Sequence, residues 1–163
     1  MQNWYAIYTR PRWEKKVESE LKYKGIDVYL PLQKKLKQWS DRKKKVETPL
    51  FPSYVFVNID YKFRFDVLQT SGVVKFVAFS GEVDTVPDKE IEFIKLICDS
   101  EYEIESSYEN FEKGQMVTVT SGSLKGLIGE VMDIKSSSKL LIRIDSLKQN
   151  ITLTINPGFL EAI

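Results

Sequence analysis

Hydrophobic and polar residues recur with a changing period along the first hundred positions. The run Trp4–Tyr8 is short and rich in aromatic and aliphatic residues, which predicts a buried strand. Trp13, Val17 and Leu21 then recur every four residues among charged neighbours, which predicts an amphipathic helix. Gly25 is expected to end that helix, because glycine tolerates the left-handed backbone that commonly follows a helix C-terminus.

Two further segments carry strand patterns. Ile26–Leu32 predicts a strand interrupted by Pro31, and Leu50–Ile59 has the strongest strand pattern of the whole chain. Lys34–Lys45, which lies between them, is polar and basic. This composition fits either a hairpin tip or a mobile loop.

The first hundred residues contain three more expected elements. Asp60 is suited to cap a short helix, and Val73–Phe79 predicts another strand. A third helix is expected to begin at Pro87, with Ile91 and Ile94 on its inner side. Strands and helices in this mixed order predict an α+β fold, with helices packed on an antiparallel sheet.

The pattern of hydrophobic and polar residues changes after residue 100. Residues 101–110 are acidic and contain serine, which predicts a linker between a first domain, 1–100, and a second domain, 111–163. The second domain has no helical period and instead contains short alternating runs separated by turn residues. These runs are Met116–Thr120, Leu127–Ile134, Leu140–Ile144 and Ile151–Ile155. Closely spaced short strands predict a small antiparallel barrel.

Composition narrows the classes of function. The chain has no histidine, so it lacks the commonest general base and the commonest metal ligand. Its one cysteine, Cys98, cannot form an intrachain disulfide, which favours a reducing cytosol. Neither a secretory signal nor a run of bilayer length is visible. We therefore expect a cytoplasmic protein with no cofactor, no bound metal and no catalytic activity.

The charges are segregated along the chain although the net charge is only +1. Residues 1–50 carry 13 Lys and Arg against 6 Asp and Glu, whereas residues 81–112 carry 2 against 11. A basic first part indicates a polyanion nearby, and an acidic stretch limits indiscriminate binding. The alternative is that both segments are simply solvated faces.

Two sets of motifs carry a family resemblance. The segments Gly114–Val119 and Gly122–Val131 resemble the KOW motif, which occurs in SH3-like barrels of transcription factors and also in ribosomal proteins. The segments Met1–Arg10 and Leu50–Val57 resemble the two signature segments of the NusG N-terminal domain. The chain is thus similar to the NusG family over nearly its whole length. This resemblance implies an N-terminal antiparallel sheet with packed helices and a C-terminal all-β KOW barrel.

Within that family the chain is more similar to the specialised paralogues, RfaH and the UpxY-type regulators of polysaccharide loci. The segments that carry this finer resemblance are Met1–Tyr5, Arg10–Lys16 and Gln38–Lys44 before Pro49. One departure concerns the His-Thr-Thr element with which RfaH reaches the far side of the polymerase cleft. The corresponding segment here lies near Arg64–Asp66, so that contact is either made differently or absent.

The resemblance implies contacts for the first domain. An apolar patch that grips the clamp helices of the largest RNA polymerase subunit corresponds to Tyr8, Phe51, Tyr54 and Phe56. The alternative is that these aromatic residues belong to the core of a sheet covered on both faces. Contacts to the non-template DNA strand correspond to Arg10, Arg12, Trp13 and Lys16. For Trp13 the alternative is a place in the buried stripe of its helix.

The resemblance also implies a partner for the KOW domain, either the termination factor Rho or a small-subunit ribosomal protein. Leu124 and Leu127 are the candidate contacts, and the alternative is that they close the end of the barrel. RfaH can refold this domain as a helical hairpin that masks the polymerase site. The β-branched residues and glycines of residues 115–155 instead predict a permanent barrel that leaves Tyr8, Phe51 and Tyr54 accessible.

The function implied is that of a monomeric transcription elongation or antitermination factor of bacteria. It would suppress pausing or termination at specialised operons such as polysaccharide loci. Three alternatives remain open: a housekeeping NusG-type factor, a ribosome-associated RNA-binding protein with a KOW barrel, and an enzyme that uses a pocket of carboxylates.

Overall fold

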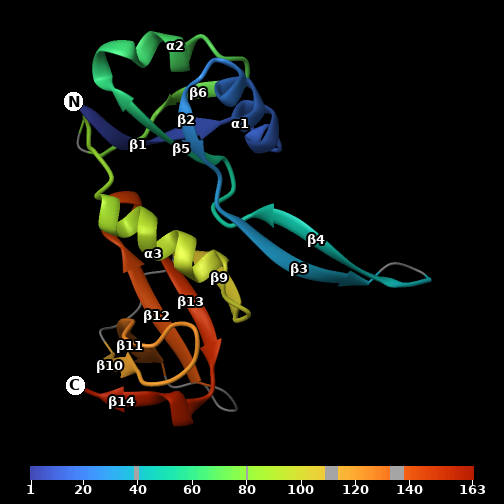
Figure 1. The fold of residues 1–163 in the computed structure, drawn as a ribbon, viewed down its shortest axis with the longest axis vertical. Helices are drawn as coiled ribbons and strands as arrows, with labels where there is room; N and C mark the ends of the chain where they lie inside the picture. Colours follow the sequence, from blue (N-terminus) through green and yellow to red (C-terminus); the bar gives the residue numbers. More distant parts are fainter. Residues whose placement is uncertain (39–40, 80, 109–113, 133–137) are drawn as a thin grey trace. The chain divides into compact units, whose positions relative to one another are not determined.

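The chain folds into two compact units, Met1–Glu92 and Phe93–Ile163 (Figure 1). The structure is a computed structural model, and it describes all residues except 39–40, 80, 109–113 and 133–137. Each unit has its own antiparallel sheet. The expected combination of an α+β first part and an all-β second part is confirmed.

The first unit is built on a four-stranded antiparallel sheet with the order β2–β5–β1–β6. These strands are Asp27–Tyr29, Tyr54–Asp60, Gln2–Thr9 and Val73–Phe76. The central pair, β1 and β5, aligns Tyr8 with Tyr54 and Gln2 with Asp60. The strands expected from Trp4–Tyr8 and from the second half of Leu50–Ile59 are therefore confirmed, and they form the middle of the sheet.

Helices α1 (Glu14–Tyr23) and α2 (Arg64–Leu68) cover the same face of this sheet (Figure 1). Apolar residues of both helices join one core cluster with residues of β1 and β5. The buried members are Tyr5, Ile7, Val17, Leu21, Leu30, Val55, Val57, Ile59, Val67 and Phe76. Val17 and Leu21, two of the three residues predicted to lie on the apolar side of α1, are thus buried as expected. The 3₁₀ turn η1 (Tyr61–Phe63) precedes α2, and Asp60 caps it by accepting from the Lys62 backbone N–H at 3.2 Å.

The basic segment forms a hairpin and not an irregular loop. Strands β3 (Leu32–Gln38) and β4 (Lys43–Pro49) pair along their whole length and leave the main sheet as a separate ribbon (Figure 1). The register sets Lys37 directly opposite Lys44. Residues 32–49 contain seven Lys and Arg against two Asp and Glu, so this segment has a net positive charge.

The expected strand Val73–Phe79 is divided in two. After β6, the short strand β7 (Ala78–Phe79) pairs with β8 (Glu82–Val83) in a small hairpin of its own. The predicted third helix is confirmed as α3 (Asp88–Cys98), in which Ile91, Ile94 and Ile97 are buried. Among the described residues, no helix is long and apolar enough to cross a bilayer.

The second unit is a six-stranded antiparallel sheet with the order β14–β10–β11–β12–β13–β9. These strands are Leu160–Ala162, Gln115–Val119, Ile128–Met132, Ser138–Ile144, Gln149–Ile155 and Glu103–Ser107. The turns η2 (Asp145–Leu147) and η3 (Pro157–Phe159) join the last strands. Where residues 115–155 are described, their regular elements are the strands β10 to β13 and the 3₁₀ turn η2, so the predicted β structure is confirmed. The expected end of the second run, 133–134, lies outside the described residues.

Strand β9 corrects the linker expected at residues 101–110. Its residues pair with β13, and Ile104 lies opposite Leu153 with 6% of its surface exposed. Glu103 and Glu105 alternate with Ile104 and are exposed. Backbone pairing with β13 and the burial of Ile104 attach this segment to the sheet. Its acidic, serine-containing composition resembles that of a linker, which is why the sequence predicted one. Residues 109–110 lie outside the described residues.

Candidate functional site

The face of the N-terminal sheet opposite the helices carries aromatic residues. Successive side chains of a strand point to opposite faces, so Val55 and Val57 join the core while Tyr54 and Phe56 point the other way. Tyr8 lies directly opposite Tyr54 in the register. Their rings are 4.8 Å apart, and the Tyr54 hydroxyl donates to the Tyr8 hydroxyl at 3.1 Å.

The remaining aromatic residues pack around Phe56. The Phe51 ring meets it edge-on at 6.4 Å between centroids, and the Tyr29 ring stacks on it at 6.3 Å. Phe51, Tyr54 and Phe56 are 1%, 3% and 0% exposed. The expectation that Phe51 and Tyr54 are accessible is therefore wrong in this structure, because the rings pack against one another.

Tyr8 differs from the other members of the aromatic face because it is only half-buried. The Lys75 ammonium lies 5.6 Å from the centre of its ring. In this cation–π contact, the negative face of the ring attracts the ammonium. Sequence patterns did not indicate Tyr29 or Lys75, because their places depend on strand register and not on spacing along the chain.

A tight turn joins the aromatic face to α1. Ser53 has a left-handed φ of +69°, and its carbonyl accepts from the Thr9 backbone N–H at 2.8 Å. Its own N–H donates to the Glu14 carboxylate at 3.0 Å, and Glu14 is buried. The turn that carries Phe51 is thus held by both β1 and α1. No sequence signal identified Glu14, whose role depends on a contact 39 residues away.

Two of the predicted DNA contacts, Arg10 and Lys16, lie beside the third, Trp13. The Lys16 ammonium and the Arg10 guanidinium lie 4.7 Å and 5.8 Å from the centre of its ring. Trp13 is half-buried and packs against the core cluster, so both interpretations of this residue hold in part. Arg12 is exposed and has a left-handed φ of +69°, so it lies outside α1, which begins at Glu14.

Gly72 supports Trp13 from the turn before β6. The Gly72 carbonyl accepts from the Arg10 backbone N–H at 2.8 Å, and its φ is +92°. A Cβ at this position would lie 2.6 Å from Cε3 of Trp13 and 3.0 Å from a methyl group of Val17. Only glycine therefore allows the indole ring to pack this closely against the turn.

In the second unit, the predicted partner contacts are buried. Leu124 and Leu127 are 0% and 4% exposed, and the Leu127 N–H donates to the Leu124 carbonyl at 3.0 Å. Gly126 between them has a φ of +93°. This geometry agrees with the alternative in which both leucines close the end of the sheet core.

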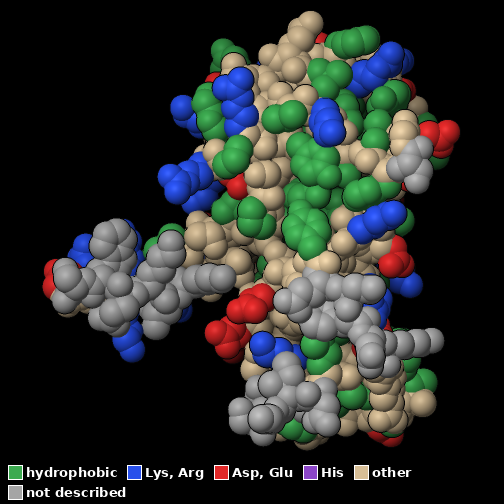
Figure 2. All heavy atoms as spheres, turned by 180° about the vertical axis from the view of Figure 1, so that it is seen from behind, with side chains coloured by type: hydrophobic (Ala, Val, Ile, Leu, Met, Phe, Trp, Pro, Cys, Tyr) green, Lys and Arg blue, Asp and Glu red, His purple; other side chains and the backbone are tan. Residues whose placement is uncertain are grey.

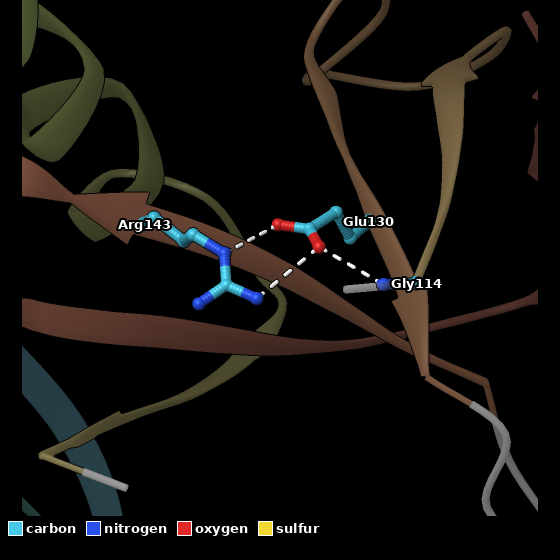
Figure 3. A network of polar contacts seen from close by, with 3 residues as sticks. All are labelled: Gly114, Glu130 and Arg143. Carbon is cyan, nitrogen blue, oxygen red and sulfur yellow. Dashed lines mark hydrogen bonds and ion pairs between the residues drawn. The ribbon is translucent and has the colours of Figure 1, made fainter. Parts of the chain in front are cut away.

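A polar network holds the start of β10 (Figure 3). The Glu130 carboxylate accepts from Nε of Arg143 at 2.7 Å, from Nη2 of Arg143 at 3.2 Å and from the Gly114 N–H at 3.0 Å. The Glu130 side chain is 8% exposed and that of Arg143 is 33% exposed. Hydrogen bonding to Glu130 raises the pKa of Arg143 above its ordinary value. The pair ties β11, β12 and the segment before β10 together.

Figure 2 shows the molecule from behind, with hydrophobic side chains gathered over the middle of the N-terminal unit and Lys and Arg side chains around them. Apolar area bordered by positive charge is typical of a surface that binds another macromolecule. The fold and this surface define a two-unit α+β protein, with an aromatic and basic first unit and a second unit built mainly on one antiparallel sheet.

Comparison with known proteins identifies the family. The family model described as "Transcription termination factor nusG" matches residues 2–95, which is more than half of the chain. The chain belongs to the NusG family. It is 23% identical to the transcription termination/antitermination protein NusG of Borreliella burgdorferi, over 86% of this chain and 89% of that protein. It is 26% identical to the protein of the same name from Staphylococcus carnosus, over 87% and 85%.

The fold also agrees with a solved structure. The structure titled "Domain interaction in Thermotoga maritima NusG" covers 100% of this chain, and 98% of that chain is covered in turn. The TM-score is 0.62 at 23% identity. At this identity the likeness supports the fold alone, with an N-terminal α+β domain followed by a KOW domain.

Proposed function

We propose that this protein is a transcription termination/antitermination factor that binds RNA polymerase and suppresses pausing or termination without catalysing a reaction. The observation that carries the proposal is the match of the NusG family over residues 2–95, which includes the whole aromatic face and the basic start of α1. The relatives from Borreliella burgdorferi and Staphylococcus carnosus bear the name of transcription termination/antitermination proteins.

The polymerase contact is assigned to the clamp helices of the largest subunit, through Tyr8, Tyr54, Phe51 and Phe56. Tyr8 is the member with free surface, and its hydroxyl is fixed by that of Tyr54. The two buried phenylalanines hold the face in shape. In this arrangement Tyr8 makes the direct contact, and the other three residues act mainly by positioning it.

The nucleic-acid contact is assigned to the non-template DNA strand, through Arg10, Arg12, Trp13 and Lys16. Proteins that bind single strands combine cations for the phosphates with an aromatic ring for a base, and a stacked base contributes about 1–3 kcal/mol. Here two cations flank one half-buried indole ring. The hairpin β3–β4 adds positive charge within the same unit.

The second unit is assigned the recruitment of a further partner, either Rho or a small-subunit ribosomal protein. Leu124 and Leu127 contribute by holding their turn in place, since both are buried. We further propose a specialised role at particular operons such as polysaccharide loci. That role rests on the sequence resemblance of Arg10–Lys16 and Gln38–Lys44 to the specialised paralogues, and a housekeeping role is the alternative.

A pull-down from native bacterial extract tests the polymerase contact. The full chain carries an affinity tag, and the variants are Tyr8→Ala and the control Tyr23→Ala, which changes a 91% exposed tyrosine of α1. Wild type and Tyr23→Ala should retain polymerase subunits, while Tyr8→Ala retains several-fold less. Retention of ribosomal subunits without polymerase, by wild type, would contradict the proposal and favour the ribosome-associated alternative.

The DNA contact has its own measurement. Arg10→Glu combined with Lys16→Glu should reduce crosslinking to the non-template strand in a transcribing complex and reduce pause suppression in parallel. Polymerase retention should change little, because the aromatic residues are unaltered. Mapping the genes occupied by the protein in cells separates the specialised role, with few sites, from the housekeeping role, with most transcribed genes.

A further inference from the structure

A second aromatic surface lies on the helical side of the first unit, in the segment Tyr61–Phe65. Tyr61, Phe63 and Phe65 are 37%, 51% and 57% exposed. Three exposed rings within five consecutive residues are unusual for a surface that meets only water, and such apolar patches commonly mark binding sites. We call Tyr61, Lys62, Phe63, Arg64 and Phe65 the η1–α2 surface.

Each ring of the η1–α2 surface has a cation beside it. The Arg64 guanidinium lies 4.9 Å from the ring centre of Tyr61 and 4.7 Å from that of Phe65. The Lys62 ammonium lies 5.1 Å from the ring centre of Phe63. Arg64 is further fixed by a hydrogen bond from Nη1 to the Tyr61 carbonyl at 3.2 Å. Rings and positive charges therefore alternate at short spacing.

Tyr61 anchors the η1–α2 surface to the sheet. The Tyr61 ring lies 5.4 Å from that of Tyr5 and 5.8 Å from that of Phe76, both of which belong to the core cluster. Asp60 caps η1 through the Lys62 N–H. A fixed platform loses little conformational entropy on binding, which favours stacking of a flexible ligand.

The local charge favours an anionic ligand. The Asp60 carboxylate is occupied by the N-terminal ammonium at 2.8 Å, and this hydrogen bond together with the Lys62 N–H lowers the pKa of Asp60. At the other side, the Lys24 ammonium donates to the Asp66 carbonyl at 3.0 Å and to the Thr70 hydroxyl at 2.8 Å. Lys24, Lys62 and Arg64 thus outweigh Asp66 around the rings.

The η1–α2 surface also connects with the site around Trp13. Only residues 69–71 separate the end of α2 from Gly72, which packs against Trp13 and accepts a hydrogen bond from Arg10. Both helices lie on the same face of the sheet, because their buried residues share one core cluster. A strand bound at Arg10, Trp13 and Lys16 can therefore continue onto α2 without crossing to another face.

We propose that the η1–α2 surface is a second subsite for single-stranded nucleic acid, continuous with the Trp13 site. Bases stack on Phe63 and Phe65, and Lys62 and Arg64 meet the phosphates. Proteins that bind single strands without sequence preference combine the same two features, stacking rings and a basic track. The proposal rests on the proposed DNA contact, since it extends that contact by several nucleotides.

Fluorescence anisotropy with the full chain tests this subsite. The probes are labelled oligothymidylates of about 4 and about 12 nucleotides, which bracket the usual site sizes of single-strand binders. We expect Phe63→Ala combined with Phe65→Ala to weaken binding of the long probe on the order of tenfold or more, with little effect on the short probe. Tyr23→Ala, which removes a still more exposed ring elsewhere on the unit, should leave both affinities unchanged. Arg64→Gln should reduce the salt dependence of the long probe by about one unit of slope.

Equal affinity of the phenylalanine double variant and wild type for the long probe would overturn the proposal. Loss of polymerase retention by that variant with unchanged affinity for the long probe would also overturn it, because the surface would then bind protein. Circular dichroism confirms that the variant is folded, which is expected because both rings are exposed. A separate result would show that the proposed DNA contact at Trp13 is wrong. In that case Arg10→Glu combined with Lys16→Glu would leave the affinity for the short probe unchanged.

Discussion

The carboxylate of Glu14 accepts a hydrogen bond of 3.0 Å from the backbone N–H of Ser53. Glu14 lies in the first turn of α1, and Ser53 lies in the turn that leads into β5. The contact holds Ser53 at a φ of +69°, a conformation that is strained for a residue with a side chain. The helix that carries the basic site and the turn that carries the aromatic face are thus joined by one buried carboxylate.

Replacing Glu14 should therefore affect both sites. Glu14→Ala leaves the Ser53 N–H without its acceptor, and an unsatisfied buried group costs about 1–3 kcal/mol of unfolding free energy. Glu14→Gln keeps an acceptor oxygen and should lose less. Urea unfolding measures the effect, and Glu20→Ala is the control because Glu20 is exposed on the same helix. Equal midpoints for Glu14→Ala and Glu20→Ala would show that the contact contributes nothing.

Gly72 and Gly25 offer a matched pair of substitutions. Both have left-handed φ angles, +92° and +80°, so alanine adds similar backbone strain of about 1–2 kcal/mol at each position. Only the Cβ at residue 72 meets Trp13, at 2.6 Å, whereas no atom lies within 4 Å of one at residue 25. Gly72→Ala should thus be more destabilising than Gly25→Ala by about 1–3 kcal/mol, the usual effect of overpacking.

Spectroscopy and binding extend the Gly72 comparison. The displaced indole ring should change the tryptophan emission of Gly72→Ala, and crosslinking to the non-template strand should fall with it. Gly25→Ala should keep both properties of the wild type. If the two variants have the same unfolding free energy, then Gly72 does not position Trp13.

The Glu130–Arg143 pair allows a double-mutant cycle in the second unit. Arg143→Met leaves the Glu130 carboxylate, 8% exposed, without its guanidinium. Removal of one partner from a fully buried pair costs about 3–5 kcal/mol, and we expect about 2 kcal/mol here because the Arg143 side chain is one third exposed. Glu130→Gln combined with Arg143→Met should lose less than the sum of the single changes. Additive losses, measured by urea unfolding, would mean that the two side chains do not interact.

The sequence predicted those parts of the fold that depend on local period. The four-residue spacing of Val17 and Leu21 places them on the buried side of α1, and the glycine and β-branched content of residues 115–155 agrees with the strands observed there. The start of α1 at Glu14 could not be predicted in this way, because it depends on the left-handed φ of Arg12, which no spacing reveals. The alternation of residues along β5 distinguishes the two faces of the strand. It does not show how much of the face that carries Tyr54 and Phe56 is covered by other residues.

The candidate site depends more strongly on contacts between distant segments. Tyr29 and Phe51 pack on Phe56 where β2 and the turn before β5 meet, and this contact between distant segments could not be predicted from spacing. The sequence therefore left the burial of this face as one of two interpretations. The basic residues beside Trp13 were easier to predict than the burial of the aromatic face. Arg10 and Lys16 lie three residues away on either side of it, and the chain geometry at the start of α1 brings both to its ring.

The last prediction concerns β9, whose residues have the composition of a linker but the pairing of a strand. Ile104 is 6% exposed opposite Leu153, so Ile104→Ala should lose about 2–4 kcal/mol, as large-to-small changes in a core usually do. Glu105→Ala is the control, since Glu105 is exposed on the same strand and should change stability by less than about 0.5 kcal/mol. Hydrogen exchange locates the effect: amide protection along Glu103–Ser107 and in the facing part of β13 should fall in Ile104→Ala and persist in Glu105→Ala. If the amides of β9 exchange freely in the wild type, the segment is a linker after all and both substitutions should be silent.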